Sequence, residues 1–254
     1  MLSKRHAEIL RMLADEGTVT ISELAARLGV SLETVRRDVR PLTENGSVLK
    51  IHGAVGLAGQ VGEAPFQRRM RENADAKRRI ARDMARLIHD GESVMLDTGT
   101  TTSFVARELL GHRRLTVVTN SSDIARTLAT VNGNKVYMAG GELRSDSGAA
   151  FGVSAIEFIA KFSVTHAIIS AGAIDAVSGV MDFDLEEAEF ARMMLSRGEK
   201  TYVVTDHTKF GRRGLVLVAG FDAIGHLVTD EPVTDDLAEV LDAYQTRLIV
   251  AASG

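Results

Sequence analysis

The sequence contains no cysteine among its 254 residues. Disulfide bonds and thiolate chemistry are therefore excluded, and the absence is compatible with a reducing cytoplasm. The seven histidines show no spacing typical of a metal site, so His207 is expected to be a hydrogen-bonding loop residue. We expect no metal and no other cofactor.

Long apolar segments are also absent. No run of apolar residues approaches the length of a membrane-spanning helix, and residues 1–5 lead into a charged amphipathic helix instead of a signal-peptide core. The chain has no internal repeat and no low-complexity tract. We therefore expect a cytoplasmic protein with no membrane partner.

The length and composition predict two modules. With 254 residues, 45% of them hydrophobic, the chain can form one small domain and one larger core of ordinary size. Small residues and a proline between Leu57 and Pro65 break both helical and strand periodicity. We expect a first domain at 1–57, a linker at 58–75 and a second domain at 76–254. The net charge of −4 divides into +1 for the first 57 residues and −5 for the rest, which favours a small-molecule or assembly role for the second domain.

The segment 31–42 predicts a helix with two different faces. Val35, Val39 and Leu42 recur at i, i+4 and i+7 and share an apolar side, while three arginines project elsewhere. Ser31 is a good N-cap, and the N-terminus of such a helix directs backbone N–H groups and the helix dipole toward phosphate. This pattern is typical of a recognition helix that reads the major groove of DNA.

The flanking residues predict a winged helix-turn-helix of the α+β class. Ser22 is expected to cap a second helix at 23–28, and Gly29–Val30 supplies the tight turn before the third helix. Residues 47–53 then alternate like a short hairpin strand, the wing. The residues expected to contact DNA are Ser31, Leu32, Glu33, Thr34, Arg36, Arg37, Arg40, Lys50 and His52.

About the first 55 residues resemble the DNA-binding domain of the DeoR family of bacterial transcriptional regulators. The resemblance lies in Arg5-His6, Ile9, Gly17, Glu23-Leu24-Ala25, Leu28, Val30-Ser31, Glu33-Thr34-Val35-Arg36-Arg37-Asp38, Leu42, Gly46 and His52-Gly53-Ala54. Two positions depart from the family pattern. Pro41 lies inside the expected recognition helix, whose last turn it should kink or shorten, and Ala54 replaces a second glycine.

Beyond the linker, helical stretches alternate with short β-rich runs. Near-continuous apolar runs between helices indicate a mostly parallel sheet covered on both faces, which defines an α/β domain. The predicted strands are 93–96, 115–118, 135–139, 167–170, 201–204 and 226–228.

Polar loops follow these strands, and ligands of parallel sheets bind where the strands end. Asp97–Ser103 combines a glycine turn with hydroxyls and with the N–H groups of the next helix, a pattern that can surround a phosphate. Lys209 offers a cation for the same anion. The residues expected to bind a small polar effector are Asp97, Thr98, Gly99, Thr100, Thr101, Thr102, Asn120, Gly141, Arg144, Asp175, Glu187 and Lys209.

Each of these residues alone has a structural alternative. Residues 98–102 can be a helix start with satisfied hydroxyls, Asp175 can be a cap, and Lys209 can be a solvated surface charge. The basic stretch 67–86 can contact phosphates, but a solvated linker and helix face with i, i+4 ion pairs is the favoured interpretation. The common placement of the polar residues after predicted strands favours a ligand site.

The second domain resembles the DeoR effector domain, whose fold is similar to that of sugar-phosphate isomerases. The resemblance then covers nearly the whole chain. Segments 97–102, 119–120, 140–145, 181–184 and 206–212 look particularly like the glycerol-3-phosphate repressor branch. The resemblance implies that the threonine-rich loop binds the phosphate of an inducer, with help from Lys209. These residues do not identify the sugar or polyol that carries the phosphate.

The alternative is a sugar-phosphate isomerase-type enzyme fused to a DNA-binding domain, with Glu187 as general base. The isomerase pattern Asp-Gly-Ala-Asp is similar to Ala171–Asp175, so that Ala171 replaces its first carboxylate, and Ala191 stands where many regulators carry lysine. A methyl group cannot transfer a proton. We therefore predict a regulator and not an enzyme. It is expected to repress a carbohydrate or polyol operon by binding double-stranded operator DNA as a homodimer or higher homo-oligomer, and to be released by a phosphorylated sugar or polyol.

Overall fold

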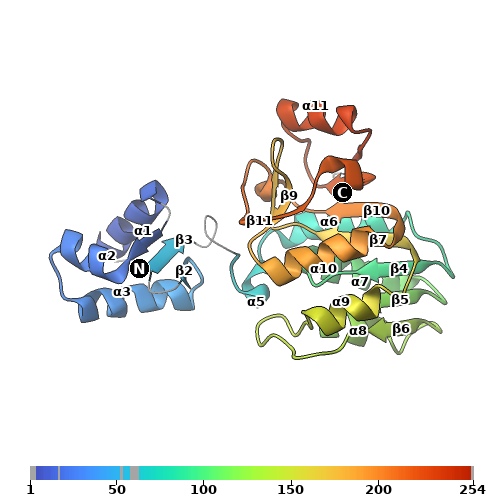
Figure 1. Ribbon diagram of the computed structural model, residues 1–254, viewed down its shortest axis with the longest axis horizontal. Helices are drawn as coiled ribbons and strands as arrows, with labels where there is room; N and C mark the ends of the chain where they lie inside the picture. Colours follow the sequence, from blue (N-terminus) through green and yellow to red (C-terminus); the bar gives the residue numbers. More distant parts are fainter. Residues whose placement is uncertain (1–3, 17, 52–53, 58–62, 253–254) are drawn as a thin grey trace. The chain divides into compact units, whose positions relative to one another are not determined.

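The computed structural model describes residues 4–16, 18–51, 54–57 and 63–252. They form two compact units, divided between Arg68 and Arg69 (Figure 1). This division lies within the stretch that composition predicts as the linker. The domain boundaries at 57 and 75 stay predictions.

The small unit combines three helices with a three-stranded antiparallel sheet of order β1-β3-β2. Its elements are α1 (Lys4–Glu16), β1 (Thr18–Thr20), α2 (Ile21–Leu28), α3 (Leu32–Glu44), β2 (Val48–Ile51) and β3 (Ala54–Leu57). Buried apolar side chains of these elements form one core: Ile9, Leu13, Val19, Leu24, Ala25, Val35, Val39, Leu42, Val48 and Val55. The predicted helix-turn-helix with a wing is confirmed.

Two local features of this unit differ from the prediction. The cap of α2 is Thr20 and not Ser22, because Thr20 accepts from the N–H of Glu23 at 3.1 Å while the Glu23 carboxylate accepts from the N–H of Thr20 at 2.9 Å. This reciprocal pair is a capping box, which needs a glutamate three residues after the cap. Pro41 does not shorten α3, which continues to Glu44, although the proline offers no N–H to the fourth carbonyl before it.

The large unit is built on a seven-stranded parallel sheet of order β13-β12-β10-β7-β4-β5-β6. In chain order the strands are β4 (Ser93–Leu96), β5 (Thr116–Thr119), β6 (Lys135–Met138), β7 (Val164–Ser170), β10 (Gly198–Val204), β12 (His226–Thr229) and β13 (Arg247–Val250). All six predicted strands are present, and β13 is an addition at one edge. The parallel α/β domain is confirmed.

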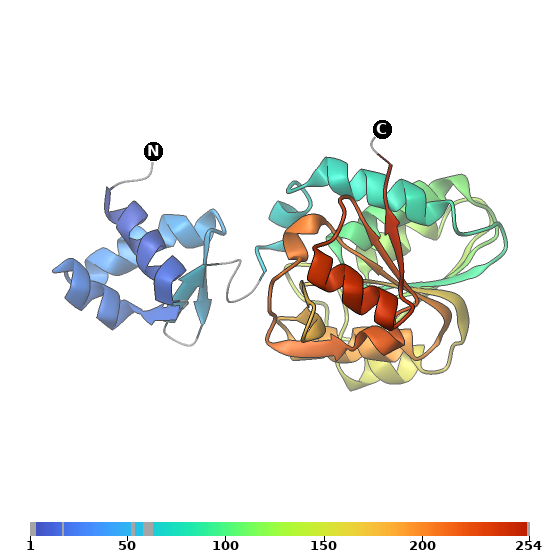
Figure 2. The same ribbon diagram turned by 90° about the horizontal axis from the view of Figure 1, so that it is seen from above.

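Helices cover both faces of this sheet (Figure 2). One face packs against α6 (Ala74–Ala85), α7 (Thr100–Glu108) and α8 (Ser122–Leu128), and the other against α9 (Val153–Ile159), α10 (Leu185–Leu195) and α11 (Asp235–Ala243). Short helical turns complete the unit: η1 (Leu109–Gly111), η2 (His207–Lys209) and η3 (Phe221–Ala223). A further short helix, α5 (Phe66–Arg69), spans the division between the two units. Among the residues described, no helix combines the length and apolarity that a membrane crossing requires.

A second, antiparallel sheet of order β11-β9-β8 packs beside α10. Its strands are β8 (Ala173–Asp175), β9 (Gly179–Asp182) and β11 (Val216–Ala219), and none of them was predicted. Gly179 has a φ of +87°, and a Cβ there would lie 2.6 Å from the carbonyl oxygen of Ala219. Glycine therefore permits the close approach of β9 to the end of β11.

Candidate functional site

Helix α3 has the two faces that its sequence predicts. Gly29 takes a left-handed φ of +64° in the turn before it, and the hydroxyl of Ser31 accepts from the N–H of Thr34 at 3.2 Å. Val35, Val39 and Leu42 are fully buried in the small core. Exposed side chains on the helix include Leu32, Glu33, Arg36, Arg37 and Arg40. The cationic face of α3 is thus free of the core of its own unit.

The charges on α3 are arranged differently on its two sides. On the inner side, the carboxylate of Asp38 pairs with Arg5 of α1, and the hydrogen bonds from Arg5 lower the pKa of Asp38. On the outer side, Arg40 Nε lies 2.8 Å from Glu44 and Arg36 lies 3.7 Å from Glu33, both in exposed pairs. Such pairs contribute little stability, so these arginines can exchange partners at low cost.

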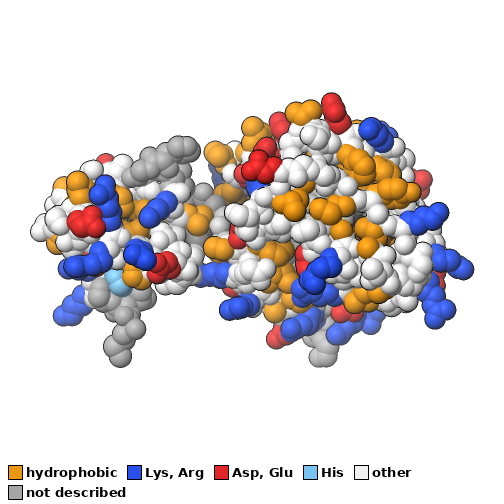
Figure 3. All heavy atoms as spheres, turned by 90° about the horizontal axis from the view of Figure 1, so that it is seen from below, with side chains coloured by type: hydrophobic (Ala, Val, Ile, Leu, Met, Phe, Trp, Pro, Cys, Tyr) orange, Lys and Arg blue, Asp and Glu red, His pale blue; other side chains and the backbone are white. Residues whose placement is uncertain are grey.

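Other cationic residues lie on the small unit outside this helix. Lysine and arginine side chains, blue in Figure 3, are scattered over its surface. Lys50 is exposed on β2, while His52 lies outside the described residues. The wing strand therefore presents at least one cation that can meet phosphate.

The threonine-rich loop lies at the carboxyl end of β4, where α7 begins. Asp97, the first residue after β4, is buried, and its Oδ2 accepts from the N–H of Ser170 at 2.8 Å and from the Ser170 hydroxyl at 3.0 Å. Burial raises the pKa of Asp97 to about 6 in spite of these bonds. Its other oxygen, Oδ1, is buried without a hydrogen-bond partner among the described residues. A buried acceptor of this kind is rare, and a bound ligand could donate a hydrogen bond to it.

Gly99 and the three threonines after it form the N-terminus of α7. Gly99 is the N-cap and has no side chain to accept from the first N–H groups of the helix. A Cβ at this position would lie 2.0 Å from the hydroxyl oxygen of Ser170, so no larger residue fits. Thr100, Thr101 and Thr102 are buried, and the hydroxyl of Thr102 donates to the carbonyls of Asp97 and Gly99, at 3.0 Å each. This helix terminus can accept an anion.

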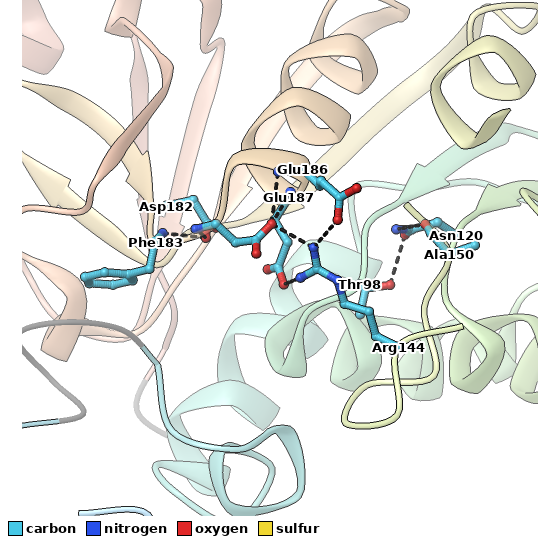
Figure 4. A network of polar contacts seen from close by, with 9 residues as sticks. Thr98, Asn120, Arg144, Ala150, Asp182, Phe183, Glu186 and Glu187 are labelled. Atoms are coloured by element: carbon cyan, nitrogen blue, oxygen red, sulfur yellow. Dashed lines mark hydrogen bonds and ion pairs between the residues drawn. The ribbon is translucent and has the colours of Figure 1, made fainter. Parts of the chain in front are cut away.

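Asn120 follows the neighbouring strand β5 and is tied to the same loop. Its Oδ1 accepts from the hydroxyl of Thr98 at 2.9 Å, and its Nδ2 donates to the carbonyl of Ala150 at 3.0 Å (Figure 4). Asp97, Thr98 and Asn120 are thus brought together by adjacent strand ends.

Arg144, in the loop between β6 and α9, is bound to the start of α10. Its guanidinium donates to Glu187 at 2.8 Å and to Glu186 at 2.7 Å (Figure 4), and to Asp184 at 2.8 Å. It also lies 4.2 Å from the centre of the Phe151 ring. Burial disfavours the charge of Asp184, but the hydrogen bonds from Arg144 and from backbone N–H groups lower its pKa. A ligand that binds Arg144 must therefore compete with three carboxylates.

An open hollow of about 590 Å³ lies beside Arg144. It is lined by Glu142, Leu143, Arg144, Ser145, Asp146, Phe151 and Glu186. Gly141 precedes this lining in the same loop. The hollow does not include the threonine-rich loop, so the two groups of predicted effector residues are not joined by it.

The last two predicted residues lie in different surroundings. Lys209 ends η2, the short helical turn that follows β10 after Thr205 and Asp206, and is half-buried. Asp175 ends β8, where it accepts from the N–H of Ser178 at 2.8 Å and lies 3.4 Å from Arg213. Both of these contacts of Asp175 lie beside the antiparallel sheet, and neither involves the threonine-rich loop.

Several residues around these sites were not singled out from the sequence. Ser170, Asp184 and Glu186 are the partners described above. His207, in contrast, was predicted to be a hydrogen-bonding residue: its backbone N–H donates to Asp230 at 2.8 Å, and its Nδ1 lies 2.9 Å from Asp230 and 3.4 Å from Glu231. The hydrogen bond to Asp230 raises the pKa of His207.

The ligand atoms of His207, Asp230 and Glu231 lie within 4.8 Å of one another, so they can hold a cation. Arg79 already places its guanidinium 3.6 Å from Asp230, which disfavours a second positive charge there.

A helix-turn-helix with an exposed arginine-bearing helix, followed by an α/β unit with a polar site at its strand ends, defines a DNA-binding regulator with a ligand-sensing domain. The comparisons with known families agree with this class. Residues 5–61 match the DeoR-like helix-turn-helix domain, and residues 72–231 match the DeoR C-terminal sensor domain. The chain belongs to the DeoR family of transcriptional regulators.

Curated relatives match over almost the full length. The chain is 35% identical to the HTH-type transcriptional repressor CsqR of Escherichia coli strain K12, over 97% of this chain and 94% of that protein. It is 32% identical to the glycerol-3-phosphate regulon repressor of the same organism, over 97% of this chain and 98% of that protein. The chain is therefore a transcriptional regulator and not an enzyme, as predicted.

Solved structures similar to this chain include ribose 5-phosphate isomerase A from Methanocaldococcus jannaschii. The TM-score is 0.41 and the identity 15%, over 55% of each chain.

Proposed function

We propose that this regulator represses a carbohydrate or polyol catabolic operon and leaves its operator when a phosphorylated sugar or polyol binds the sensor domain. The observation that carries this proposal is the start of α7. There an N-cap without a side chain adjoins a buried carboxylate oxygen of Asp97 that has no hydrogen-bond partner among the residues described. N–H groups at such a terminus favour a phosphate, and a carboxylate oxygen accepts from a hydroxyl. A ligand with both groups satisfies both needs.

In this proposal the predicted site residues have distinct tasks. Residues 98–102 and Lys209 bind the phosphate, while Asp97, Asn120, Asp175 and Glu187 accept hydrogen bonds from the hydroxyls of the effector. Gly141 and Arg144 lie in the loop after β6, and their proposed task is to contact the same ligand. The relatives named for the glycerol-3-phosphate regulon support glycerol 3-phosphate as the first candidate.

On DNA, we propose that a homodimer or higher homo-oligomer places two copies of α3 in successive major-groove turns of an operator in the cytoplasm. Base edges are contacted by Ser31, Leu32, Glu33, Thr34 and Arg36. The phosphate backbone of the DNA is contacted by Arg37, Arg40, Lys50 and His52. The linker at 58–75 connects the DNA-binding domain to the sensor domain, so that effector binding in one domain affects operator binding by the other. For release, the effector must bind the DNA-bound and free arrangements with different affinity.

A gel shift with DNA from upstream of the protein's own locus tests both halves of the proposal. We expect retardation at moderate salt, and loss of the complex on addition of glycerol 3-phosphate or another phosphorylated sugar or polyol. Glycerol and inorganic phosphate serve as matched controls, because each carries only half of the ligand chemistry. A protein that binds this DNA but responds to no phosphorylated compound would contradict the proposed effector class.

A further inference from the structure

The segment 69–73 follows the small unit in the chain and is held against α6 by a buried lysine. Lys77 is 4% exposed, and its Nζ donates to the carbonyl of Arg69 at 2.5 Å and to that of Glu72 at 2.7 Å. A buried ammonium group requires such acceptors, because it has lost its water. Residues 69–72 are therefore fixed to the first turn of α6.

Asn73 ends this segment and connects it to the loop after β10. Its side-chain Nδ2 donates to Asp206 Oδ1 at 3.1 Å and lies 3.4 Å from the hydroxyl of Thr208. Asp206 is 2% exposed and caps η2, where it also accepts from the N–H of Thr208 at 3.2 Å. The amide of Asn73 thus contacts the start of the short turn that ends at Lys209.

The backbone of Asn73 is in the left-handed conformation, with φ +50° and ψ +35°. This conformation is uncommon for a residue other than glycine and persists where the surrounding contacts hold it. The side-chain bonds of Asn73 to Asp206 and Thr208 are contacts of this kind. These bonds therefore help to hold the backbone at the start of α6.

We propose that Asn73 is a positioning residue that couples the effector loop 206–209 to the connecting segment 69–73. When Lys209 moves toward a bound anion, η2 changes its contacts with Asn73, and the change reaches the residues that lead to the DNA-binding unit. This inference rests on the proposed function, since it requires that Lys209 binds the effector. Because coupling is reciprocal, operator binding also changes the affinity for the effector by the same factor.

Asn73→Gly tests this coupling, because glycine removes the amide but still accepts a left-handed φ. Asn132→Gly is the matched control: Asn132 has φ +51°, and its amide donates to the carbonyls of Leu110 and His112 at 2.7 and 2.9 Å, away from η2. The ratio of operator affinities without and with glycerol 3-phosphate should fall by about fivefold or more in Asn73→Gly. The affinity of Asn73→Gly for the effector in the absence of DNA should stay within about threefold of the wild-type value. The reason is that Asn73 is proposed to couple effector binding to operator binding and not to contact the effector.

Asn73→Asp adds a second test, because it places a carboxylate against that of Asp206. The repulsion should reduce the ratio at least as much as Asn73→Gly does. Wild-type ratios in both variants would overturn the inference, as would an equal loss in Asn132→Gly.

Hydrogen exchange on the ligand-free full-length protein tests the same connection without an effector. We expect faster exchange of the N–H groups of Thr208, Lys209 and Phe210 in Asn73→Gly but not in Asn132→Gly. Unchanged protection of this loop would overturn the coupling even if the proposed function holds. Failure of every phosphorylated compound to release wild-type protein would instead contradict the proposed function, while the exchange result still decides the connection.

Discussion

Asp97 and Ser170 join the ends of two neighbouring strands, because one carboxylate oxygen of Asp97 accepts from both the N–H and the hydroxyl of Ser170, at 2.8 and 3.0 Å. These bonds satisfy one oxygen and leave the other without a partner among the described residues. The pair therefore fixes the loop before α7 and keeps an acceptor available for a ligand.

The raised pKa of Asp97 predicts a specific pH dependence of stability. Burial raises the pKa from 3.8 to about 6 in the folded protein, so the folded state retains a proton that the unfolded chain has released. The contribution to the free energy of unfolding is complete below the unfolded pKa of 3.8 and falls by about 3 kcal/mol in total as the pH rises through the folded pKa of about 6. Asp97→Asn should remove this fall, as measured by denaturant unfolding of the ligand-free protein between pH 4 and 7.

Asp175→Asn is the control for this experiment. The hydrogen bond with Ser178 lowers the pKa of Asp175 from 3.8, so its contribution to stability is lost only as the pH falls below about 3.8. Asp175→Asn should therefore leave the change in stability between pH 4 and 7 as it is in the wild type. Parallel stability curves for wild type and Asp97→Asn would contradict the assignment.

Arg36→Ala should weaken operator binding by about 1–3 kcal/mol if Arg36 reads a base edge. The side chain is exposed, and its pairing with Glu33 at 3.7 Å is weak, so the substitution should leave the fold intact. Arg11→Ala removes an exposed arginine from α1 of the same unit and serves as the control. Gel shifts with operator and unrelated DNA measure the effect, and equal operator affinities of wild type and Arg36→Ala would exclude Arg36 from recognition.

Lys209→Ala should weaken effector binding by about tenfold or more while operator binding without effector is retained, because a phosphate loses one charged hydrogen-bond donor. Lys161→Ala, an exposed lysine after α9, is the matched control. Calorimetric titration with glycerol 3-phosphate measures the affinity. Wild-type affinity in Lys209→Ala would remove this residue from the site.

Local patterns were sufficient to predict the recognition helix and the parallel strands. The spacing of Val35, Val39 and Leu42 defines a buried stripe whatever the rest of the fold, and an apolar run such as Ser93–Leu96 is long enough to mark a strand. The antiparallel strands escaped prediction for two reasons. Strands β8 and β9 meet at Asp175 and Gly179, residue types that favour turns over strands, and β11 pairs with β9 from a distant part of the sequence. The N-cap of α2 was also assigned wrongly from the sequence. Ser22 and Thr20 are equally good caps by residue type, and only the hydrogen bonds with Glu23 identify Thr20.

The candidate site could be located but not assembled from the sequence. Because parallel strands end at one edge of a sheet, residues such as Asp97 and Asn120 were expected to meet. The partners of Arg144 could not be predicted, because Asp184 and Glu186 come from a helix about 40 residues away, and only the loop conformation brings them together. The role of Asn73 could not be predicted for the same reason, since its contact with Asp206 spans 133 positions.

Gly99→Ala should distort the candidate phosphate site, because the new Cβ would lie 2.0 Å from the hydroxyl oxygen and 2.6 Å from the Cβ of Ser170. Overpacking of this kind costs about 1–3 kcal/mol and should displace the start of α7, with loss of effector binding. Gly140→Ala is the control, since no atom lies within 4 Å of a Cβ there.

The clash can be relieved from the other side. Ser170→Gly removes both contacting atoms of Ser170, so the double variant Gly99→Ala/Ser170→Gly should recover part of the thermal stability and of the effector-induced shift in melting temperature. The recovery should be incomplete, because Asp97 also loses the hydroxyl of Ser170 as a donor. If the double variant is no more stable than Gly99→Ala, contact with Ser170 is not the reason that this position requires glycine.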